Sequence, residues 1–264
     1  MPETSIESAE FSRPLVIPSP VELEVLVPDE ETLEANHVVG FRGNDIRSRP
    51  FNLLRSQVVK ELDAQDWKIL GMTSATPAAG KSFLSLNLAA ALSRLADQKV
   101  YLFDFDLRRG SLAEALGIHG KLGLGEFLAG KTDDLKAVGH RIDDSNLALF
   151  PCFRVKTNSA EMLAGKRFEL LMQAIANLPD DAIVICDLPP AFANDDTLMI
   201  AQYLDAYMLV IEQGITTKKQ MNNTVSLLNP TPCLGTVLNR YVGGLVDPYG
   251  YGYGSGAYSK YYAD

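Results

Sequence analysis

Long apolar runs alternate with amphipathic segments along most of this chain, and this alternation strongly constrains its fold. The apolar runs predict strands in "WKILGMTS", "KVYLFDFD", "LALFP", "AIVICD", "AYMLVIE" and "CLGTVLN". The segments between them predict helices in "KSFLSLNLAAALSRLAD", "AEMLAGKRFELLMQAIANL", "DTLMIAQYL" and "TKKQMNNTVSLLN". Continuous apolar strands joined by helices are typical of a sheet that is buried on both faces. The pattern therefore predicts an α/β three-layer sandwich, with a mostly parallel central sheet and helices on both faces.

One more amphipathic helix is expected before the first of these strands. In "DIRSRPFNLLRSQVVKELDAQ", the apolar residues Phe51, Leu54, Val58 and Leu62 recur at helical spacing. Pro50 suits the first turn of such a helix, because a first-turn residue needs no backbone N–H. We expect this helix to lead into the main domain.

The acidic charge is concentrated at the N-terminus. Of a net charge of −9, residues 1–40 contribute −8, from nine acidic groups and one arginine. This stretch is rich in proline and lacks a consistent period, so we expect residues 1–40 to be a disordered acidic tail. A strand in "ELEVLV" that pairs with a partner is the alternative. Residues 41–245 would form the folded domain and residues 246–264 a flexible tail. No basic face is expected, which argues against binding to nucleic acid.

Composition also sets expectations about location and cysteine chemistry. No run approaches the roughly 20 apolar residues of a membrane-spanning helix, and "MPETSIESAE" lacks the layout of a signal peptide. We therefore expect a cytoplasmic protein. Cys152, Cys186 and Cys233 are widely spaced in apolar surroundings, so buried reduced thiols are expected in place of disulfides or metal ligands.

The stretch "ATPAAGKSF", residues 75–83, has the form of a phosphate-binding loop. Gly80, Lys81 and Ser82 open a helix directly after a strand, and Ala75 stands where the first glycine is usual. Backbone N–H groups and the helix N-terminus can face a polyphosphate, while the lysine reaches its outer phosphates and the serine binds Mg²⁺. An ordinary strand-to-helix turn is the alternative interpretation of this loop alone.

Carboxylates follow two other predicted strands. Asp104 and Asp106 end "KVYLFDFD", and Asp187 ends "AIVICD". Because the carboxyl ends of parallel strands meet at one edge of the sheet, these side chains should lie beside the phosphate-binding loop. Mg²⁺ prefers such oxygen ligands. The combination predicts a site for a nucleotide with Mg²⁺.

These motifs together resemble the bacterial tyrosine kinases that control capsule and exopolysaccharide synthesis. The resemblance rests on "TSATPAAGKSFLSLNLAAALS", "VYLFDFDLRRGSL" and "AIVICDLPP", which match the Walker A, A′ and B motifs of that family, and on "NSAEMLAG" and "LGTVLNR". It implies the fold of P-loop nucleoside triphosphatases, with ATP and Mg²⁺ as cofactors. It also implies a catalytic set of Lys81, Asp104 and Asp106, with either aspartate as the base.

The resemblance assigns further roles position by position. Mg²⁺ would be held by Ser82, Asp104 and Asp187. The nucleotide would contact Ala78, Ala79, Gly80, Lys81, Ser82, Phe83, Asn239 and Arg240. Arg108 or Arg109 could neutralise charge on the phosphates or on the substrate, or could be an ordinary surface arginine.

Two departures from the family pattern stand out. The helix used for ring assembly carries a glutamate and two arginines in the family, and the matching residues here are Arg49, Asn52 and Arg55. Ala78 and Ala79 replace a frequent glycine and glutamate in the phosphate-binding loop. We expect nucleotide binding to survive if these alanines keep a negative φ.

The C-terminal residues suggest the substrate. Seven of the ten tyrosines lie from Tyr241 onward, in a glycine-rich stretch. Next to a phosphate-binding loop, they are expected to be phosphoacceptors on a flexible tether, namely Tyr249, Tyr251, Tyr253, Tyr258, Tyr261 and Tyr262. A low-complexity tail that self-associates, or a tail that binds a polysaccharide or a partner, is the alternative.

The predicted function is that of an ATP-dependent tyrosine autokinase that phosphorylates tails in trans and regulates exopolysaccharide or capsule polymerisation and export. The resemblance implies a membrane polysaccharide co-polymerase as activator, a protein-tyrosine phosphatase, and a homo-oligomer formed through tail exchange. It also implies recruitment to the inner face of the membrane. The alternatives are a deviant Walker ATPase switch, whose signature lysine is replaced here by Thr76, and a nucleotide-binding scaffold without kinase activity.

Overall fold

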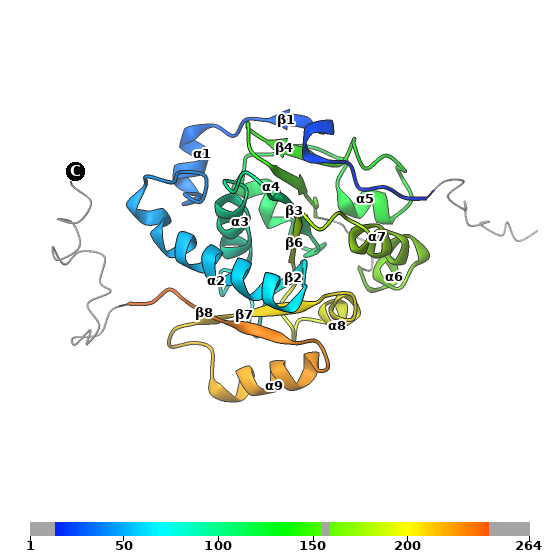
Figure 1. Ribbon diagram of the computed structural model, residues 1–264. Helices are drawn as coiled ribbons and strands as arrows, with labels where there is room; N and C mark the ends of the chain where they lie inside the picture. The colour runs from blue at the N-terminus through cyan, green and yellow to red at the C-terminus, as the bar shows by residue number, and fades with distance from the viewer. Residues whose placement is uncertain (1–13, 155–158, 243–264) are drawn as a thin grey trace, which may run out of the picture.

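The computed structural model describes residues 14–154 and 159–242. Its centre is an eight-stranded sheet in the order β1-β4-β5-β3-β6-β2-β7-β8 (Figure 1). The strands are β1 (Glu24–Leu26), β2 (Ile69–Ser74), β3 (Lys99–Asp104), β4 (His140–Ile142), β5 (Leu147–Phe150), β6 (Ala182–Asp187), β7 (Ala206–Glu212) and β8 (Cys233–Asn239). Every neighbouring pair is parallel except β4 and β5. The predicted mostly parallel sheet is confirmed.

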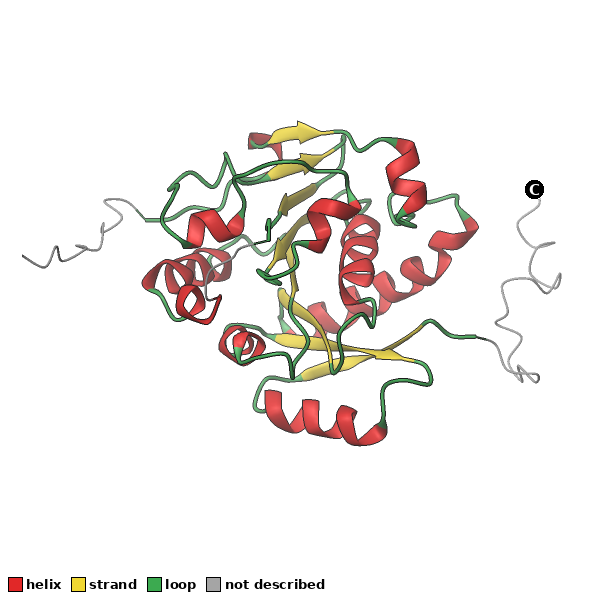
Figure 2. Cartoon of the chain, turned by 180° about the vertical axis from the view of Figure 1, so that it is seen from behind, coloured by secondary structure: helices red, strands yellow, loops and turns green. Residues whose placement is uncertain are grey.

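Helices cover both faces of this sheet. Figure 1 shows α2 and α3 on one side of the central strands and α7 and α8 on the other. The helices are α1 (Glu30–Ala35), α2 (Arg49–Gln65), α3 (Lys81–Leu92), α4 (Ser111–Ala115), α5 (Leu124–Leu128), α6 (Ser159–Leu163), α7 (Lys166–Ala176), α8 (Asp196–Ala201) and α9 (Lys218–Leu228), with 3₁₀ turns η1 (Pro20–Glu22) and η2 (Ile46–Ser48). Seen from behind, α9 lies outside the two long strands β7 and β8 (Figure 2). The three-layer sandwich is therefore confirmed as well.

The core follows from the two-residue period of the strands. Along β3, Val100 and Leu102 join the apolar cluster on the α2 and α3 side, while Tyr101 and Phe103 join the cluster on the α7 and α8 side. Helix α3 lies between the sheet and α2, and it is buried on nearly all sides. A helix that is apolar all round belongs in such a position. Burial on both faces holds the carboxyl ends of the strands in fixed register.

The N-terminal segment differs from expectation, because residues 14–40 are folded. Ile17, Leu23 and Leu33 are buried, and β1 pairs in parallel with β4 of the same chain. The prediction of a disordered tail over residues 1–40 is wrong for these residues, while residues 1–13 lie outside the described part. The apolar side chains of this segment are too irregularly spaced to show a period, but Ile17, Leu23 and Leu33 pack into the apolar clusters of the domain.

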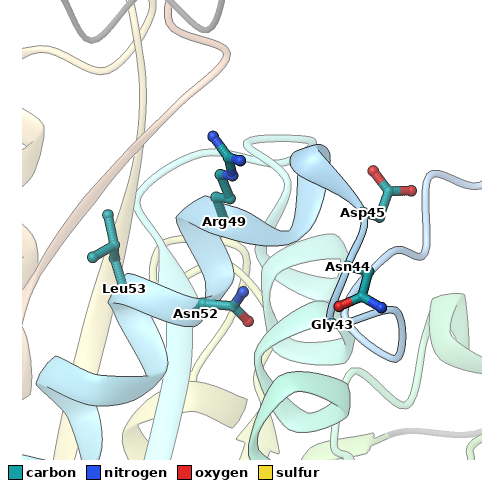
Figure 3. A pocket seen from close by; sticks show the side chains of 6 residues that line it. All are labelled: Gly43, Asn44, Asp45, Arg49, Asn52 and Leu53. Atoms are coloured by element: carbon teal, nitrogen blue, oxygen red, sulfur yellow. The ribbon is translucent and has the colours of Figure 1, made fainter. Parts of the chain in front are cut away.

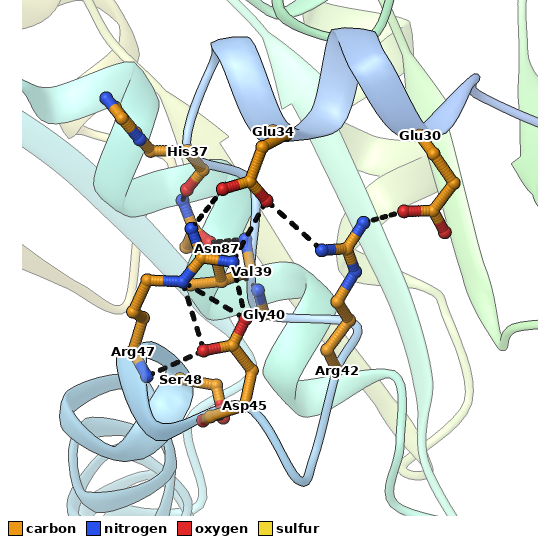
Figure 4. A network of polar contacts seen from close by, with 10 residues as sticks. All are labelled: Glu30, Glu34, His37, Val39, Gly40, Arg42, Asp45, Arg47, Ser48 and Asn87. Carbon is orange, nitrogen blue, oxygen red and sulfur yellow. Dashed lines mark hydrogen bonds and ion pairs between the residues drawn. The ribbon is translucent and has the colours of Figure 1, made fainter.

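Two acidic residues of this segment, Glu30 and Glu34, pair with arginines that follow it (Figure 4). Arg42 pairs with Glu30 and with Glu34, and Arg47 pairs with Glu34 and with Asp45. These contacts join α1 to η2, directly before α2. The high local charge counted from the sequence is therefore part of a folded network.

The same segment is also attached to helix α3. The side chain of Asn87, which is completely buried, accepts hydrogen bonds from Val39 N at 2.8 Å and from Gly40 N at 2.9 Å. Its amide group donates to the carbonyls of His37 and Phe83. The N-terminal segment is thus joined to the helix that begins with Lys81.

The other predicted elements are mostly confirmed, but one predicted helix is divided into two. "AEMLAGKRFELLMQAIANL" forms two helices, because Gly165 takes an extended conformation between α6 and α7. The helix expected before the first strand is α2, with Phe51, Val58 and Leu62 buried. In the described ranges, no helix is long and apolar enough to cross a membrane.

Candidate active site

The phosphate-binding loop joins β2 to α3 and depends on left-handed backbone at two positions. Gly80 has φ of 93°, and a Cβ at this position would lie 2.1 Å from Asn239 Nδ2, so another residue would be strained and would displace the Asn239 side chain. Ala78 has φ of 63°, whereas Ala79 is not among the residues with positive φ. The expectation that both alanines keep negative φ is therefore wrong for Ala78. The left-handed conformation costs an alanine about 1–2 kcal/mol.

Lys81, at the start of α3, forms a buried ion pair with Asp106. Lys81 Nζ lies 2.6 Å from Asp106 Oδ2, and the two residues are 5% and 2% exposed. Burial by itself lowers the pKa of Lys81, but the charges of Asp187, Asp106 and Asp104 outweigh burial and raise it. The lysine therefore stays charged, and its head group is held among three carboxylates.

Asp104 and Asp187 lie side by side at the ends of β3 and β6. They are paired in the register of the two strands, and both are completely buried. Burial raises the pKa of Asp104, and the charges of Asp187 and Asp106 raise it further. Two backbone N–H groups donate to its oxygens, those of Asp106 at 3.2 Å and of Leu112 at 3.4 Å. The strand-end carboxylates predicted from sequence do converge.

The two oxygens of Asp187 have different surroundings. Oδ1 accepts a hydrogen bond from Ser85 Oγ at 3.0 Å, while Oδ2 is buried and has no hydrogen-bond partner among the described residues. Burial raises the pKa of Asp187, against the opposing effects of Lys81, Ser82 and Ser85. Ser85 was missed by sequence reasoning. Its position one turn after Lys81, on the side of α3 that faces β6, is the signal that could have found it.

The unpartnered Oδ2 shows that these residues fit Mg²⁺. An unpartnered carboxylate oxygen can accept a hydrogen bond from a water molecule that is bound to a hard cation. Ser82 and Asp104 lie beside this oxygen and offer further oxygen ligands. Within residues 14–154 and 159–242, no group of three His, Cys, Asp or Glu side chains could hold a metal ion by itself. Mg²⁺ commonly binds through one or two carboxylates together with substrate phosphates.

A pocket of about 250 Å³ opens in front of the loop. It is lined by Ala78, Gly80, Lys81, Ser82, Phe83, Arg109, Ser111 and Arg240. Asn239 does not line it but donates from Nδ2 to the carbonyl of Ala79 at 2.8 Å, which fastens the end of β8 to the loop. Arg240 pairs with Glu212 at 2.6 Å. Most of the predicted nucleotide contacts are thus brought together.

The two arginines after Asp106 point to different neighbours. Arg109 lines the pocket of the phosphate-binding loop. The Nε of Arg108 donates to Ser159 Oγ at 3.0 Å and lies 3.8 Å from Asp196 Oδ2. The sequence alone does not distinguish the roles of these two arginines, whereas in the structure they have different neighbours.

A second pocket lies at the start of α2 and contains positions matched to the ring-assembly helix (Figure 3). Its volume is about 530 Å³, and it is lined by Gly43, Asn44, Asp45, Arg49, Asn52 and Leu53. Although it is larger, it includes no residue of the phosphate-binding loop. The Oδ1 of Asn52 accepts a hydrogen bond from Arg94, and Arg55 donates to the carbonyl of Ala91. Because Arg49 and Asn52 replace two of the three family residues, the predicted self-association is through tail exchange and not through this helix.

Two other sets of predicted residues have different outcomes. Cys152 and Cys186 are buried and free, whereas Cys233 is half-buried. The predicted phosphoacceptors from Tyr249 to Tyr262 lie outside the described residues. Tyr241, which is described, is 55% exposed.

Comparison with known proteins identifies relatives of this chain. No family model matches the chain. It is 33% identical over 160 residues to the tyrosine-protein kinase etk of Escherichia coli strain K12, which is 61% of this chain and 22% of that protein. It is 30% identical over 173 residues to the tyrosine-protein kinase wzc of Salmonella typhimurium strain LT2, which is 65% of this chain and 24% of that protein. The chain thus spans about a quarter of the length of these relatives.

Solved structures agree with the sequence relatives. The kinase domain of Escherichia coli tyrosine kinase ETK superposes with a TM-score of 0.70 at 27% identity, covering 88% of this chain and 94% of that one. The septum site-determining protein MinD of Pyrococcus horikoshii has a TM-score of 0.55 at 22% identity, covering 66% and 70% of the two chains, which is a likeness of fold alone. The chain has the fold of P-loop nucleoside triphosphatases, and in sequence and structure it is similar to bacterial tyrosine kinases.

Proposed function

We propose that this chain is an ATP- and Mg²⁺-dependent protein-tyrosine kinase that phosphorylates its own C-terminal tyrosine cluster. The observation that carries the proposal is the convergence of Lys81, Asp104, Asp106 and Asp187 beside the phosphate-binding loop. A charged lysine that is surrounded by buried carboxylates and lines a pocket of about 250 Å³ suits the transfer of a phosphoryl group. The kinase names of its sequence relatives support the same reaction.

The nucleotide would be held by the loop and by the start of α3. Backbone N–H groups around Gly80 and the N-terminus of α3 face the phosphates, and Lys81 neutralises charge on the outer ones. Asn239 keeps the loop in place, and together with Arg240 it would lie beside the adenine of ATP. Ser82, Asp104 and Asp187 would hold Mg²⁺, which neutralises charge on the phosphate oxygens when bound.

The transfer step needs alignment and one proton acceptor. The tyrosine Oη forms a bond to the γ-phosphorus, while the bond from that phosphorus to the bridging oxygen breaks and its electron pair leaves with ADP. The phenolic proton passes to Asp104 or Asp106. Their placement at the end of β3 brings both carboxylates to the side of Lys81, so either can reach the acceptor hydroxyl. Because the transition state is loose, a base of modest strength is sufficient.

We further propose that the transfer occurs in trans between copies and that it regulates exopolysaccharide or capsule polymerisation and export. Tyr249, Tyr251, Tyr253, Tyr258, Tyr261 and Tyr262 are the proposed acceptors. A membrane polysaccharide co-polymerase would recruit the chain to the inner face of the membrane and activate it, and a protein-tyrosine phosphatase would reverse the modification. Several phosphates on one tail would add about −1.5 to −2 charges each and drive neighbouring copies apart.

Two incubations test the proposal. Purified protein is incubated with labelled ATP and Mg²⁺, with and without residues 241–264, and probed for phosphotyrosine. Label should depend on the tail. A Lys81→Met chain is then mixed with a tail-deleted active chain, and label on the Lys81→Met chain is expected from transfer in trans. Absence of tail label under conditions where ATP is bound would refute the kinase proposal.

The same incubations distinguish the alternatives. A deviant Walker ATPase switch would hydrolyse ATP without labelling the tail, and a scaffold would bind ATP without either reaction. The likeness to MinD is a likeness of fold, and Thr76 stands where that class carries its signature lysine. The switch therefore has less support than the kinase.

A further inference from the structure

The order of the strands arranges the proposed site in a line along the carboxyl edge of the sheet. The end of β8 lies on one side of the phosphate-binding loop, and the ends of β6 and β3 lie on the other. An acceptor tyrosine has to approach the γ-phosphate roughly in line with the departing ADP. Asn239 and Arg240 would place the adenine of ATP on the β8 side of the loop. The acceptor tyrosine would therefore approach from the β3 side. This inference rests on the proposed kinase function, because it concerns that acceptor.

Arg108 lies on that side. The chain turns directly after Asp106, whose carbonyl accepts from the N–H groups of Arg109 and Gly110 at 2.9 and 3.1 Å. The turn sends the side chain of Arg109 to the phosphate pocket and that of Arg108 toward α6 and α8. The two adjacent arginines therefore have different neighbours.

Arg108 is held there by two buried residues. Ser159 begins α6 and is 2% exposed, and Asp196 begins α8 and is completely buried. The Oγ of Ser159 donates to Asp196 Oδ2 at 2.7 Å and accepts from Arg108 Nε at 3.0 Å. A buried carboxylate at the end of this chain of contacts favours a guanidinium at its outer end. Asp196 and Ser159 are therefore positioning residues for Arg108.

The terminal nitrogens of Arg108 make no hydrogen bond or ion pair with the described residues. The side chain is 54% exposed, and its hydrogen bond and ion pair to the described residues both use Nε. A guanidinium that is already held in place loses little freedom when it binds a ligand, and its planar fork matches a carboxylate or a phosphate. We propose that Arg108 recognises an anionic group that flanks the acceptor tyrosine.

The sequence offers such a group. Asp247 lies two residues before Tyr249, in "LVDPYGYGYG". A phosphate already attached to a neighbouring tyrosine has the same chemistry. Arg108 would therefore set a preference for acidic acceptor segments, and transfer to one tyrosine would favour transfer to the next.

Peptides of residues 245–254 test this preference. One peptide has the native sequence, a second carries Asp247→Asn, and a third carries both Asp247→Asn and a phosphate on Tyr251. KM for each peptide is measured with the full chain at saturating ATP. For the native chain we expect KM to be about fivefold lower for the native peptide than for the Asp247→Asn peptide, as for a partly exposed ion pair. The phosphorylated peptide should restore the lower KM if phosphate is also recognised, and the preference is limited to carboxylates if it does not.

Variants then assign the preference to one arginine. In Arg108→Gln the KM ratio between the two unphosphorylated peptides should fall to about one, and Ser159→Ala and Asp196→Asn should reduce it. Arg108→Lys keeps the positive charge and should retain part of the KM ratio between the two peptides. Arg109→Gln is the matched control, which should raise KM for ATP and leave the ratio as it is. A ratio that is near one in the native chain, or that survives Arg108→Gln, overturns the inference while leaving the kinase function intact.

A binding measurement separates this inference from the proposed function. Fluorescence anisotropy of labelled peptides, with a non-hydrolysable ATP analogue and Mg²⁺, gives the same ratio from Kd values without phosphoryl transfer. If no peptide is phosphorylated but the Kd ratio depends on Arg108, the kinase proposal fails and Arg108 remains an anion-recognition residue. Equal Kd values for all peptides overturn the inference.

Discussion

The two alanines of the phosphate-binding loop should respond in opposite directions to replacement by glycine. Ala78 is exposed and has φ of 63°, while Ala79 is completely buried and lies outside the left-handed region. For Ala78→Gly, relief of the left-handed conformation is worth about 1–2 kcal/mol, and the extra freedom of glycine in the unfolded chain offsets about 0.5–1 kcal/mol of it. We expect a net gain in the free energy of unfolding of about 0.5–1 kcal/mol.

Ala79→Gly is the matched control. It removes a buried methyl group, which costs about 0.8 kcal/mol, and it adds the same freedom to the unfolded chain. The free energy of unfolding should therefore fall by about 1.5 kcal/mol. Gly80→Ala provides the opposite extreme, because its new Cβ would meet Asn239 Nδ2 at 2.1 Å and should disrupt the loop.

Urea and thermal unfolding of the purified chains measure these differences. For a domain of this size, 1 kcal/mol corresponds to a shift in Tm of about 2–4 °C, so Ala78→Gly should raise Tm by about 2 °C. Ala79→Gly should lower it. A fall in stability for Ala78→Gly similar to that of Ala79→Gly would refute the left-handed backbone at Ala78 and the strain deduced from it.

Three further predictions test the carboxylate cluster, the thiols and the N-terminal network. Ser85→Ala removes a hydrogen bond to buried Asp187 and should lower the free energy of unfolding by about 1–3 kcal/mol in urea titrations, whereas an unchanged value would mean that the bond is not formed. Cys233 should be the first of the three cysteines to react with a thiol reagent in the native state, because the other two are buried; simultaneous labelling of all three would contradict this packing. The hydrogen bond from Arg47 lowers the pKa of Glu34 below its usual 4.5, so its contribution to stability is present above pH 4.5 and is lost as the pH falls through the lowered pKa. Stability measured across acid pH should therefore fall less steeply in Glu34→Gln than in the native chain, and equal slopes would exclude this contribution.

Much of the fold was predictable because its signals are local. Each central strand is a continuous apolar run, and the helices that cover them carry their apolar residues at helical spacing, as in α2 with Phe51, Val58 and Leu62. The short strands β1 and β4, of three residues each, carry no period long enough to recognise. The fold of residues 14–40 was missed for a related reason, since its buried residues contact elements far along the chain.

The candidate site was predictable to the level of residue types at strand ends. Lys81, Asp104, Asp106 and Asp187 could be placed at one edge because parallel strands end at the same edge. Their pairing could not be predicted, because which carboxylate meets Lys81 depends on the turn after β3. Ser85 carries no motif signal, and its role follows only from the packing of α3 against β6.

The layered fold, the phosphate-binding loop and the convergence of three carboxylates can be predicted from local sequence patterns. The apolar period and the residues at strand ends are properties of short segments. Burial of the strands on both faces then holds these strand ends at one edge of the sheet. Three features cannot be predicted in this way: the left-handed backbone at Ala78, the Lys81–Asp106 pair and the different neighbours of Arg108 and Arg109. These features depend on contacts between segments that lie far apart in the sequence, and no single segment determines those contacts.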